Sequence, residues 1–289
     1  MSIKSFLKNN THSLSKKTVA VSGATGGIGR RLCDHLASLG ADLILLDRNT
    51  EKSNGLAALL KEKHPDLKCS HIRVDMEDIS SVKRACDLLL NTEVDYLVLN
   101  AGAYSIPRHK CDTGYDNVFQ INFISPYFMA RKLYPLIKSR GGKIVAVGSI
   151  AHNYSKTDAL DVDFSTRAKA SLVYGNAKRY LMFSLPDIDT DEAYISITHP
   201  GITFTNITAH YPKLVFALIK HPMKIIFMSP KKASLSILSG IFLDTEKGEW
   251  IGPRFFSVWG LPKKKRLNTA TAQEIRTIAD QAKKIYKGL

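Results

Sequence analysis

The sequence predicts an α/β fold, a single doubly wound parallel sheet with helices on both faces, formed by residues 1–289 as one domain. Short apolar runs alternate along the chain with segments whose apolar residues recur at helical spacing. Strands that are apolar throughout are typical of parallel sheets covered on both faces. A glycine-rich turn also joins the first apolar run to a helix, which is common at the first strand of such sheets.

The individual elements follow from local composition. We predict strands at residues 18–21, 43–46, 72–74, 96–99, 143–147 and 195–198, and a last strand at 255–259. We predict helices at residues 28–39, 56–60, 82–90, 115–139, 213–228, 235–242 and 270–287. Residues 151–170 are polar and lack periodicity, which favours a surface loop. Right-handed crossovers between the strands then make a doubly wound sheet the economical topology.

Composition and charge limit the classes of partner. The chain is 44% hydrophobic and 23% charged, as in ordinary globular proteins, and its formal net charge is +15. The basic residues are spread along the chain and no known nucleic-acid recognition module is present, so we expect no nucleic-acid partner. A basic surface equally suits acidic ligands or an anionic membrane.

The cysteines and the N-terminus bear on metal content and location. The four cysteines (Cys33, Cys69, Cys86 and Cys111) show neither metal-type pairing nor a disulfide framework, so we expect no metal and a reducing compartment. Residues 2–17 lack the continuous apolar core of a secretory signal. No run of about 20 apolar residues occurs that could span a membrane. We therefore expect a cytoplasmic protein, with peripheral membrane contact left open.

The glycine-rich turn is the first candidate binding site. It contains Gly23, Thr25, Gly26, Gly27, Ile28 and Gly29. Glycines let backbone N–H groups approach a pyrophosphate, and the start of the following helix supplies partial positive charge. The spacing fits both G-x-x-x-G-x-G and G-x-x-G-x-x-G, and the turn alone does not decide between them.

Tyr174 and Lys178 are the first candidate catalytic pair. They are four residues apart, so in a helix the phenol and the ammonium project from one face. A nearby ammonium favours phenolate, so we expect Lys178 to lower the pKa of Tyr174 toward the range useful for acid–base catalysis.

A series of further motifs occurs in one order along residues 17–205. They are the glycine turn, Asp75, Asn100-Ala101-Gly102, Asn122, Ser149, Tyr174 with Lys178, and Pro200-Gly201 followed by Thr205. With these motifs the chain resembles the short-chain dehydrogenases/reductases, which have a Rossmann-type fold. Asn100-Ala101-Gly102 and Asn122 are similar to the dehydrogenase branch rather than the extended, sugar-nucleotide branch.

The resemblance implies a role for each of four residues. Tyr174 would exchange a proton with the substrate oxygen while hydride moves to or from a nicotinamide. Lys178 would depress the pKa of Tyr174 and hydrogen-bond the nicotinamide ribose. Ser149 would polarise the carbonyl, and Asn122 would hold a water that relays protons to Lys178.

The resemblance also implies a nicotinamide cofactor. It assigns cofactor contacts to Gly23, Thr25, Gly26, Gly27, Ile28, Gly29, Asp47, Arg48, Asp75, Met76, Asn100, Ala101, Gly102, Tyr174, Lys178, Pro200, Gly201, Thr203 and Thr205. Asp47 ends the second strand, where a carboxylate accepts hydrogen bonds from a ribose and repels a 2′-phosphate. Arg48 stands where relatives that accept the phosphate carry a basic residue. We expect NAD to be preferred over NADP, because a fixed carboxylate outweighs an exposed arginine.

The spacing from Ser149 to Tyr174, with His199-Pro200-Gly201, is similar to the retinol-dehydrogenase-like branch. That likeness implies a lipophilic alcohol or carbonyl substrate, although Asp47 departs from the branch. The family keeps its substrate lid at residues 203–232. There Lys213, Lys220 and Lys224 form one stripe on an apolar segment, which is typical either of a lid that contacts a membrane or of an ordinary lid and oligomer contact. Relatives that pair through long helices imply a homodimer or tetramer.

Two other functions remain open from the sequence. A sugar-nucleotide epimerase or dehydratase shares the glycine turn and the Tyr/Lys pair. A non-catalytic dinucleotide-binding protein would use the fold only to bind. The four filled catalytic positions favour an enzyme, an NAD(P)-dependent oxidoreductase acting on CH–OH donors.

Overall fold

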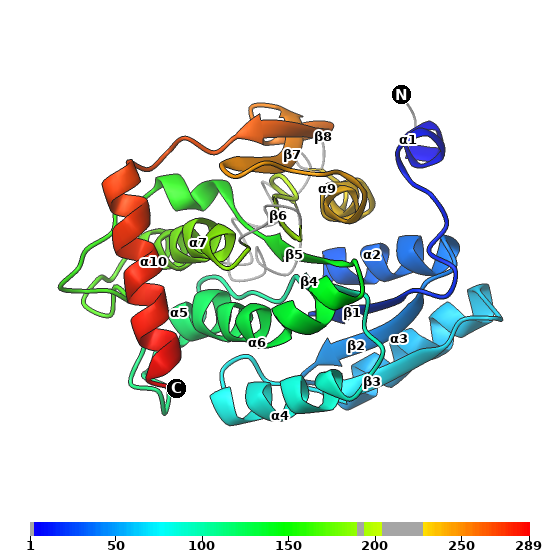
Figure 1. Ribbon diagram of the computed structural model, residues 1–289, viewed down its shortest axis with the longest axis horizontal. Coiled ribbons are helices and arrows are strands. Elements are labelled where there is room, and N and C mark those ends of the chain that lie inside the picture. Colours follow the sequence, from blue (N-terminus) through cyan, green and yellow to red (C-terminus); the bar gives the residue numbers. More distant parts are fainter. Residues whose placement is uncertain (1–2, 190–193, 204–227) are drawn as a thin grey trace, which may run out of the picture.

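The computed structural model describes residues 3–189, 194–203 and 228–289. Its centre is one eight-stranded sheet in the order β3-β2-β1-β4-β5-β6-β7-β8 (Figure 1). Neighbouring strands are parallel throughout, except that β8 runs antiparallel to β7. The strands are β1 (Thr18–Ser22), β2 (Asp42–Asp47), β3 (Cys69–Arg73), β4 (Tyr96–Leu99), β5 (Lys143–Val147), β6 (Ile195–Thr198), β7 (Glu249–Phe255) and β8 (Trp259–Arg266).

Helices cover both faces of this sheet, as Figure 1 shows. On one face lie α1 (Ile3–Asn10), α2 (Gly27–Ser38), α3 (Thr50–Lys63) and α9 (Pro230–Phe242). On the other face lie α4 (Ile79–Leu90), α6 (Ser125–Ser139), α7 (Ala170–Ser184) and α10 (Ala272–Lys287). Each face of the sheet has its own hydrophobic core beneath these helices. In β1 the side chains of Val19 and Val21 lie in the core on the α2 and α9 side, and Ala20 lies in the core on the α6 and α7 side, because successive strand residues point to opposite faces.

Short polar side chains fix where several helices begin. Asn49 caps α3 by accepting a hydrogen bond from the backbone N–H of Lys52 at 2.8 Å. Asp78 caps α4 in the same way through Ser80 N–H, and Thr271 caps α10 through Glu274 N–H at 3.2 Å. Each cap accepts a hydrogen bond from a backbone N–H that has no partner within the helix, and this stabilises the helix start at that residue.

The predicted doubly wound sheet is confirmed, with corrections to two elements. The helix predicted at 115–139 is interrupted, because α5 (Asn117–Phe119) leads into a π-helical turn at Gln120–Ile124 before α6 begins. The strand predicted at 255–259 is wrong, since β7 ends at Phe255 and the chain turns back into β8 at Trp259. The turn holds Phe256 and Ser257 at φ of 51° and 57°.

Other predictions match less closely or are not addressed by the structure. The polar N-terminal segment forms α1, whose Phe6 is buried against the α2–α9 layer. The predicted lid falls mostly on residues 204–227, which lie outside the described residues. The helix predicted at 213–228 lies outside them too, apart from its last residue. The C-terminal helix predicted at 270–287 is observed as α10.

A buried ion pair fixes α10 against α7. The Arg179 guanidinium, whose side chain is 3% exposed, meets both carboxylate oxygens of Glu274 at 2.8 and 2.7 Å. It also donates to the backbone carbonyls of His152 and Thr269. Because every partner is polar and close, the charge is well compensated despite its burial.

We predict that Glu274→Gln lowers the unfolding free energy by about 3 kcal/mol, because it leaves the Arg179 charge buried without its counter-ion. Urea unfolding of the variant against the wild type measures the loss. Asp280→Asn, an exposed acid on the same helix, is the matched control and should change stability by less than about 0.5 kcal/mol. Equal effects of the two substitutions would contradict this account of α10.

Candidate active site

A groove opens at the carboxyl ends of β1, β2 and β4, where the strand order reverses direction. Its volume is about 410 Å³. Doubly wound sheets bind ligands at this topological switch point. The groove is lined by Gly23, Thr25, Gly26, Gly27, Ile28, Gly29, Leu46, Asp47, Arg48, Asn49, Lys52, Val74, Asp75, Met76, Asn100, Ala101, Gly102, Ala103 and Ile121. Every cofactor residue expected between Gly23 and Gly102 is among them.

The glycine turn is shaped for close approach of a ligand to backbone. Gly23 has φ of +65°, and a Cβ there would lie 2.9 Å from the Cα of Ala101. A Cβ at Gly29 would collide with the carbonyl oxygens of Gly23 and Ala24. The backbone of the turn therefore lies very close to the first residues of α2, whose first N–H groups have no intrahelical partner. This geometry fits a pyrophosphate.

The far end of the groove carries both signs of charge. Asp47 is buried, and its carboxylate accepts hydrogen bonds from Thr25 N at 3.1 Å, Thr25 Oγ1 at 2.9 Å and Ser53 Oγ at 3.2 Å. Arg48 is largely exposed and lies 3.8 Å from the Asp75 carboxylate. The acid is thus fixed by three donors, whereas the arginine is held by one long ion pair.

The catalytic candidates come together at the carboxyl ends of β4 and β5. Ser149 follows β5, and its hydroxyl lies beside the Tyr174 phenol, where it acts to lower the pKa of that phenol; it also accepts a hydrogen bond from Ala151 N at 3.1 Å. Tyr174 lies on α7, one helical turn before Lys178, whose Nζ is 5.8 Å from the centroid of the Tyr174 ring. The three groups therefore converge on one place.

Lys178 is the link between this cluster and the groove. Its side chain is buried and its ammonium donates to Val147 O at 2.8 Å. A Cβ built on Gly102 would lie 3.6 Å from Lys178 Nζ and 2.8 Å from Asn122 Oδ1. Gly102 lines the groove, so both polar groups face the cofactor site across a position that only glycine leaves open.

Asn122 lies in the π-helical turn, and its side chain explains why the helix is interrupted there. Its Nδ2 donates to Val118 O and to Ala103 O, both at 2.8 Å, and its Oδ1 accepts from Ala103 N at 3.3 Å. The amide thereby ties the segment after β4 to the helix. Single π turns of this kind occur frequently at functional sites.

The pKa values correct one expectation. Burial raises the pKa of Tyr174 to about 12, while its hydrogen bond with Ser149 acts in the opposite direction. Burial also lowers the pKa of Lys178 to about 8. The expected net lowering of the Tyr174 pKa is not observed, because burial disfavours the charged form of both groups. Tyr174 is therefore a protonated phenol at neutral pH.

The Lys178 shift has a measurable effect on stability. Its pKa is about 8 in the folded protein against 10.5 ordinarily, so between these values the unfolded chain binds a proton that the folded protein lacks. Stability from this group therefore rises with pH across that window, by up to about 3 kcal/mol. We predict that the wild type gains this amount between pH 7.5 and 10.5 relative to Lys178→Met.

Urea unfolding of both proteins at several pH values measures this difference, because all other titrating groups cancel between them. A difference that does not change with pH would show that Lys178 is not a desolvated ammonium.

The remaining predicted cofactor residues lie beyond the groove lining. Pro200 and Gly201 follow β6, and Gly201 has φ of +83° with a Cβ position 2.6 Å from Val258 O. Thr203 forms an isolated bridge with Met228. Thr205 lies outside the described residues. The contacts of these residues with a cofactor stay predictions.

Sequence reasoning missed several residues of the site. Asn49, Lys52 and Ile121 line the groove. Lys52 lies in the first turn of α3, four residues after Arg48, and its place in the groove lining could have been inferred from where the second strand ends. Tyr104 packs edge-on against Tyr174 with ring centroids 5.3 Å apart. Its place depends on the path of the loop after β4, which carries no periodic pattern.

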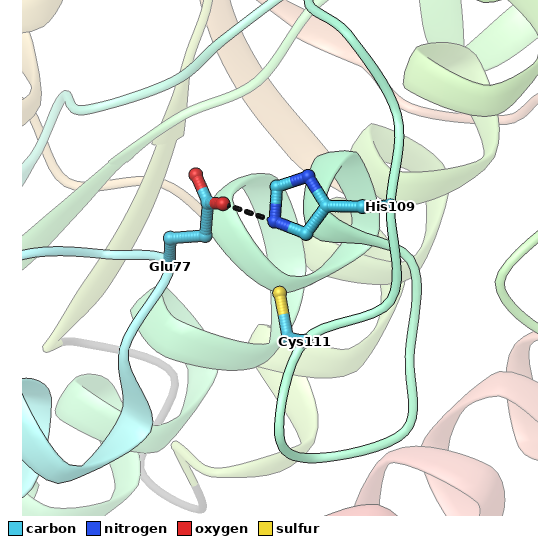
Figure 2. Close-up of side chains that lie close together, drawn as sticks. All are labelled: Glu77, His109 and Cys111. Carbon is cyan, nitrogen blue, oxygen red and sulfur yellow. Dashed lines mark ion pairs between the residues drawn. The ribbon is translucent and has the colours of Figure 1, made fainter.

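Three side chains of the kinds that bind metal ions lie together near the groove. Figure 2 shows Glu77, His109 and Cys111, whose ligand atoms are within 4.8 Å of one another; His109 Nε2 is 2.5 Å from Glu77 Oε1. Asn117 donates to Pro107 O and to His109 Nδ1, so the proton of the neutral ring is on Nε2 and faces Glu77. A cation would have to displace that proton, so the cluster is arranged as a hydrogen-bonded pair beside a thiol.

The family model for short chain dehydrogenases matches residues 17–159. A short chain dehydrogenase of Aspergillus nomiae is 34% identical over 155 residues, which are 50% of this chain and 42% of that relative. Human retinol dehydrogenase 14 is 25% identical over 82% of this chain and 78% of its own length. The chain belongs to the short-chain dehydrogenase/reductase family.

Solved structures agree on the fold of this dehydrogenase-family chain. An uncharacterised protein of Mycobacterium paratuberculosis is 20% identical and superposes with a TM-score of 0.77 over 96% of both chains. The chain covers less than half the length of the Aspergillus relative. Among the described residues, no helix combines the length and apolar character needed to cross a bilayer.

Proposed function

We propose that the protein is an NAD(P)-dependent oxidoreductase that interconverts an alcohol and a carbonyl compound. One observation carries the proposal: Tyr174, Ser149 and Lys178 converge beside Gly102, the residue at which the catalytic cluster meets the dinucleotide groove. A binding site alone needs no such cluster, whereas acid–base chemistry on a carbonyl needs a positioned proton donor.

The groove residues would hold the dinucleotide along its length. The turn from Gly23 to Gly29 would bind the pyrophosphate, Asp47 the adenosine ribose, and Asp75 with Met76 the region beside the adenine. Asn100, Ala101 and Gly102 would lie along the nicotinamide half. When bound, the nicotinamide would supply or accept the hydride.

The chain's own residues would handle the proton. Tyr174 is protonated at neutral pH, so its Oη is ready to donate to a carbonyl oxygen that gains negative charge. Ser149 would hydrogen-bond the same oxygen, and a donor of this kind can be worth a few kcal/mol of transition-state stabilisation. The Lys178 ammonium would stabilise the phenolate that remains, and Asn122, fixed across Gly102, would position the next proton carrier.

A lipophilic alcohol or carbonyl compound is the proposed substrate class. The support comes from human retinol dehydrogenase 14, whose name denotes a lipophilic alcohol as substrate. Tyr104 adds a flat aromatic wall against Tyr174, which suits an apolar carbon skeleton next to the reacting oxygen.

We predict that Tyr174→Phe folds, binds the cofactor and loses about 10²- to 10⁴-fold in kcat, because the ring remains and only the proton donor is removed. Absorbance at the reduced-nicotinamide band, with aliphatic, steroid and retinoid alcohols and carbonyls as substrates, measures turnover. Tyr154→Phe, a change at an exposed tyrosine, is the control and should leave kcat unchanged. A Tyr174→Phe enzyme with wild-type turnover would remove Tyr174 from the reaction.

For the cofactor we propose a preference for NAD over NADP. Asp47 is buried and fixed by Thr25 and Ser53, so it cannot turn away from a 2′-phosphate. Arg48 is exposed and its charge is partly offset by Asp75. Lys52, the other cation of the groove lining, weakens but does not reverse this balance.

Asp47→Ser should raise the ratio of kcat/KM for NADP to that for NAD by at least about tenfold, since one close repulsive charge is worth more than about 1.4 kcal/mol. Steady-state kinetics with both cofactors measure the ratio. Asp66→Ser, a change at an exposed acid away from the groove, should leave it unchanged. A wild type that strongly prefers NADP would overturn the assignment.

A further inference from the structure

Three large aromatic side chains are exposed together where β7 turns into β8. Phe256 is 92% exposed, Phe255 49% and Trp259 46%. The rings of Phe255 and Trp259 are also neighbours, with centroids 6.0 Å apart. Single exposed apolar residues are normal, but three within one turn form a contiguous patch. We call Phe255, Phe256 and Trp259 the aromatic tip.

The backbone holds this tip in a strained conformation. Phe256 and Ser257 have φ of 51° and 57°, a region in which bulky residues are outliers. Phe255 pairs with Trp259 across the hairpin, and Val258 N donates to Phe255 O at 3.0 Å, so the turn is fixed at both ends. The strain brings no burial of the Phe256 ring in return. Strain retained without such compensation occurs chiefly at functional sites.

Positive charge surrounds the tip. Lys232 Nζ is 4.1 Å from the centre of the Trp259 ring, and the Arg254 guanidinium is 5.7 Å from that of Phe255. Lys265 Nζ donates to Ser257 Oγ at 3.0 Å. The sequence contains no acidic residue from 250 to 273, and the whole chain has a net charge of +15. Aromatic rings flanked by cations are the side chains that favour the surface of an anionic bilayer.

The tip lies on the edge of the sheet that carries the active site. β7 runs parallel to β6, so its carboxyl end is on the same edge as the ends of β4 and β5 (Figure 1). Ile202 N, just after Gly201, donates to Val258 O at 3.3 Å. The turn that carries the tip thus contacts the segment after β6. This segment lies on the same edge of the sheet as Ser149 and as Val147 O, to which the Lys178 ammonium donates.

We propose that the aromatic tip inserts into the headgroup region of a bilayer containing anionic phospholipid and turns the active-site edge of the sheet toward it. A second copy of this chain is a poor occupant, because it would bring the same positive charge to the interface. The inference rests on the proposed function only in its purpose, which is to admit a lipophilic substrate from the membrane.

The two tryptophans of the chain allow a direct test. Trp259 is in the tip, whereas Trp250 lies within β7 and is 5% exposed. The wild type is mixed with vesicles of brominated phosphatidylcholine, with and without phosphatidylglycerol, at low and high salt and without cofactor or substrate. We expect quenching of Trp259 only with phosphatidylglycerol, reduced by salt. In Trp259→Phe the remaining Trp250 fluorescence should not be quenched.

Two variants distinguish membrane binding through the aromatic tip from non-specific binding by any exposed apolar side chain. Phe256→Asn should weaken co-sedimentation with these vesicles at least tenfold, and asparagine tolerates the positive φ so the turn persists. Leu160→Ser removes a side chain that is 99% exposed elsewhere and should bind like the wild type. Thermal unfolding confirms that both variants are folded.

Three results would overturn the proposal. The first is no vesicle binding by the wild type at low salt. The second is vesicle binding by Phe256→Asn equal to that of the wild type. The third is a wild type that is a dimer in light scattering and does not bind vesicles, and that Phe256→Asn converts to a monomer. Because no turnover is measured, these results leave the proposed oxidoreductase activity untouched, and an inactive enzyme would leave vesicle binding intact.

Discussion

The Lys178 ammonium, buried at the carboxyl end of β5, is the constraint on which the site depends. It is held by the carbonyl of Val147, and it faces Asn122 across a glycine that lines the groove. A desolvated charge is costly, and the lowered pKa records that cost. A negative charge beside the ammonium would offset that cost, and Tyr174, one helical turn away, is placed to carry it as a phenolate.

The surrounding fold explains how these groups are brought together. β4 and β5 end side by side in the sheet, so Gly102 and Ser149 are neighbours although 47 positions separate them in the sequence. The π-helical turn sets the Asn122 amide against Ala103, and α7 returns Tyr174 to the hydroxyl of Ser149. The ion pair of Arg179 with Glu274 closes α10 over the far side of α7. These contacts join segments that are far apart in the sequence, and together they place one cluster beside the switch point.

Much of this could be predicted from the sequence, and the exceptions share a physical cause. Apolar runs located five of the first six strands, and ordered motifs located the groove, because buried parallel strands and backbone-lined turns constrain local composition. The third strand, predicted at 72–74, is observed at Cys69–Arg73, since this edge strand is largely polar and only partly buried. The π turn depends on the contact of Asn122 with Ala103, which no helical periodicity reports. The pKa of Tyr174 depends on burial, which cannot be inferred from its spacing to Lys178. Residues 255–259 are as apolar as a core strand, but the structure exposes three of them at a turn.

The central claim, hydride exchange beside Tyr174, is tested most directly by following an isotope. The protein is incubated with NADH and, separately, NADPH carrying deuterium at C4 of the reduced ring, together with aliphatic, steroid and retinoid carbonyl compounds. The account predicts deuterium at the carbinol carbon of the product alcohol, with no loss to solvent. Protein that binds the dinucleotide but transfers no deuterium to any of these compounds would contradict it.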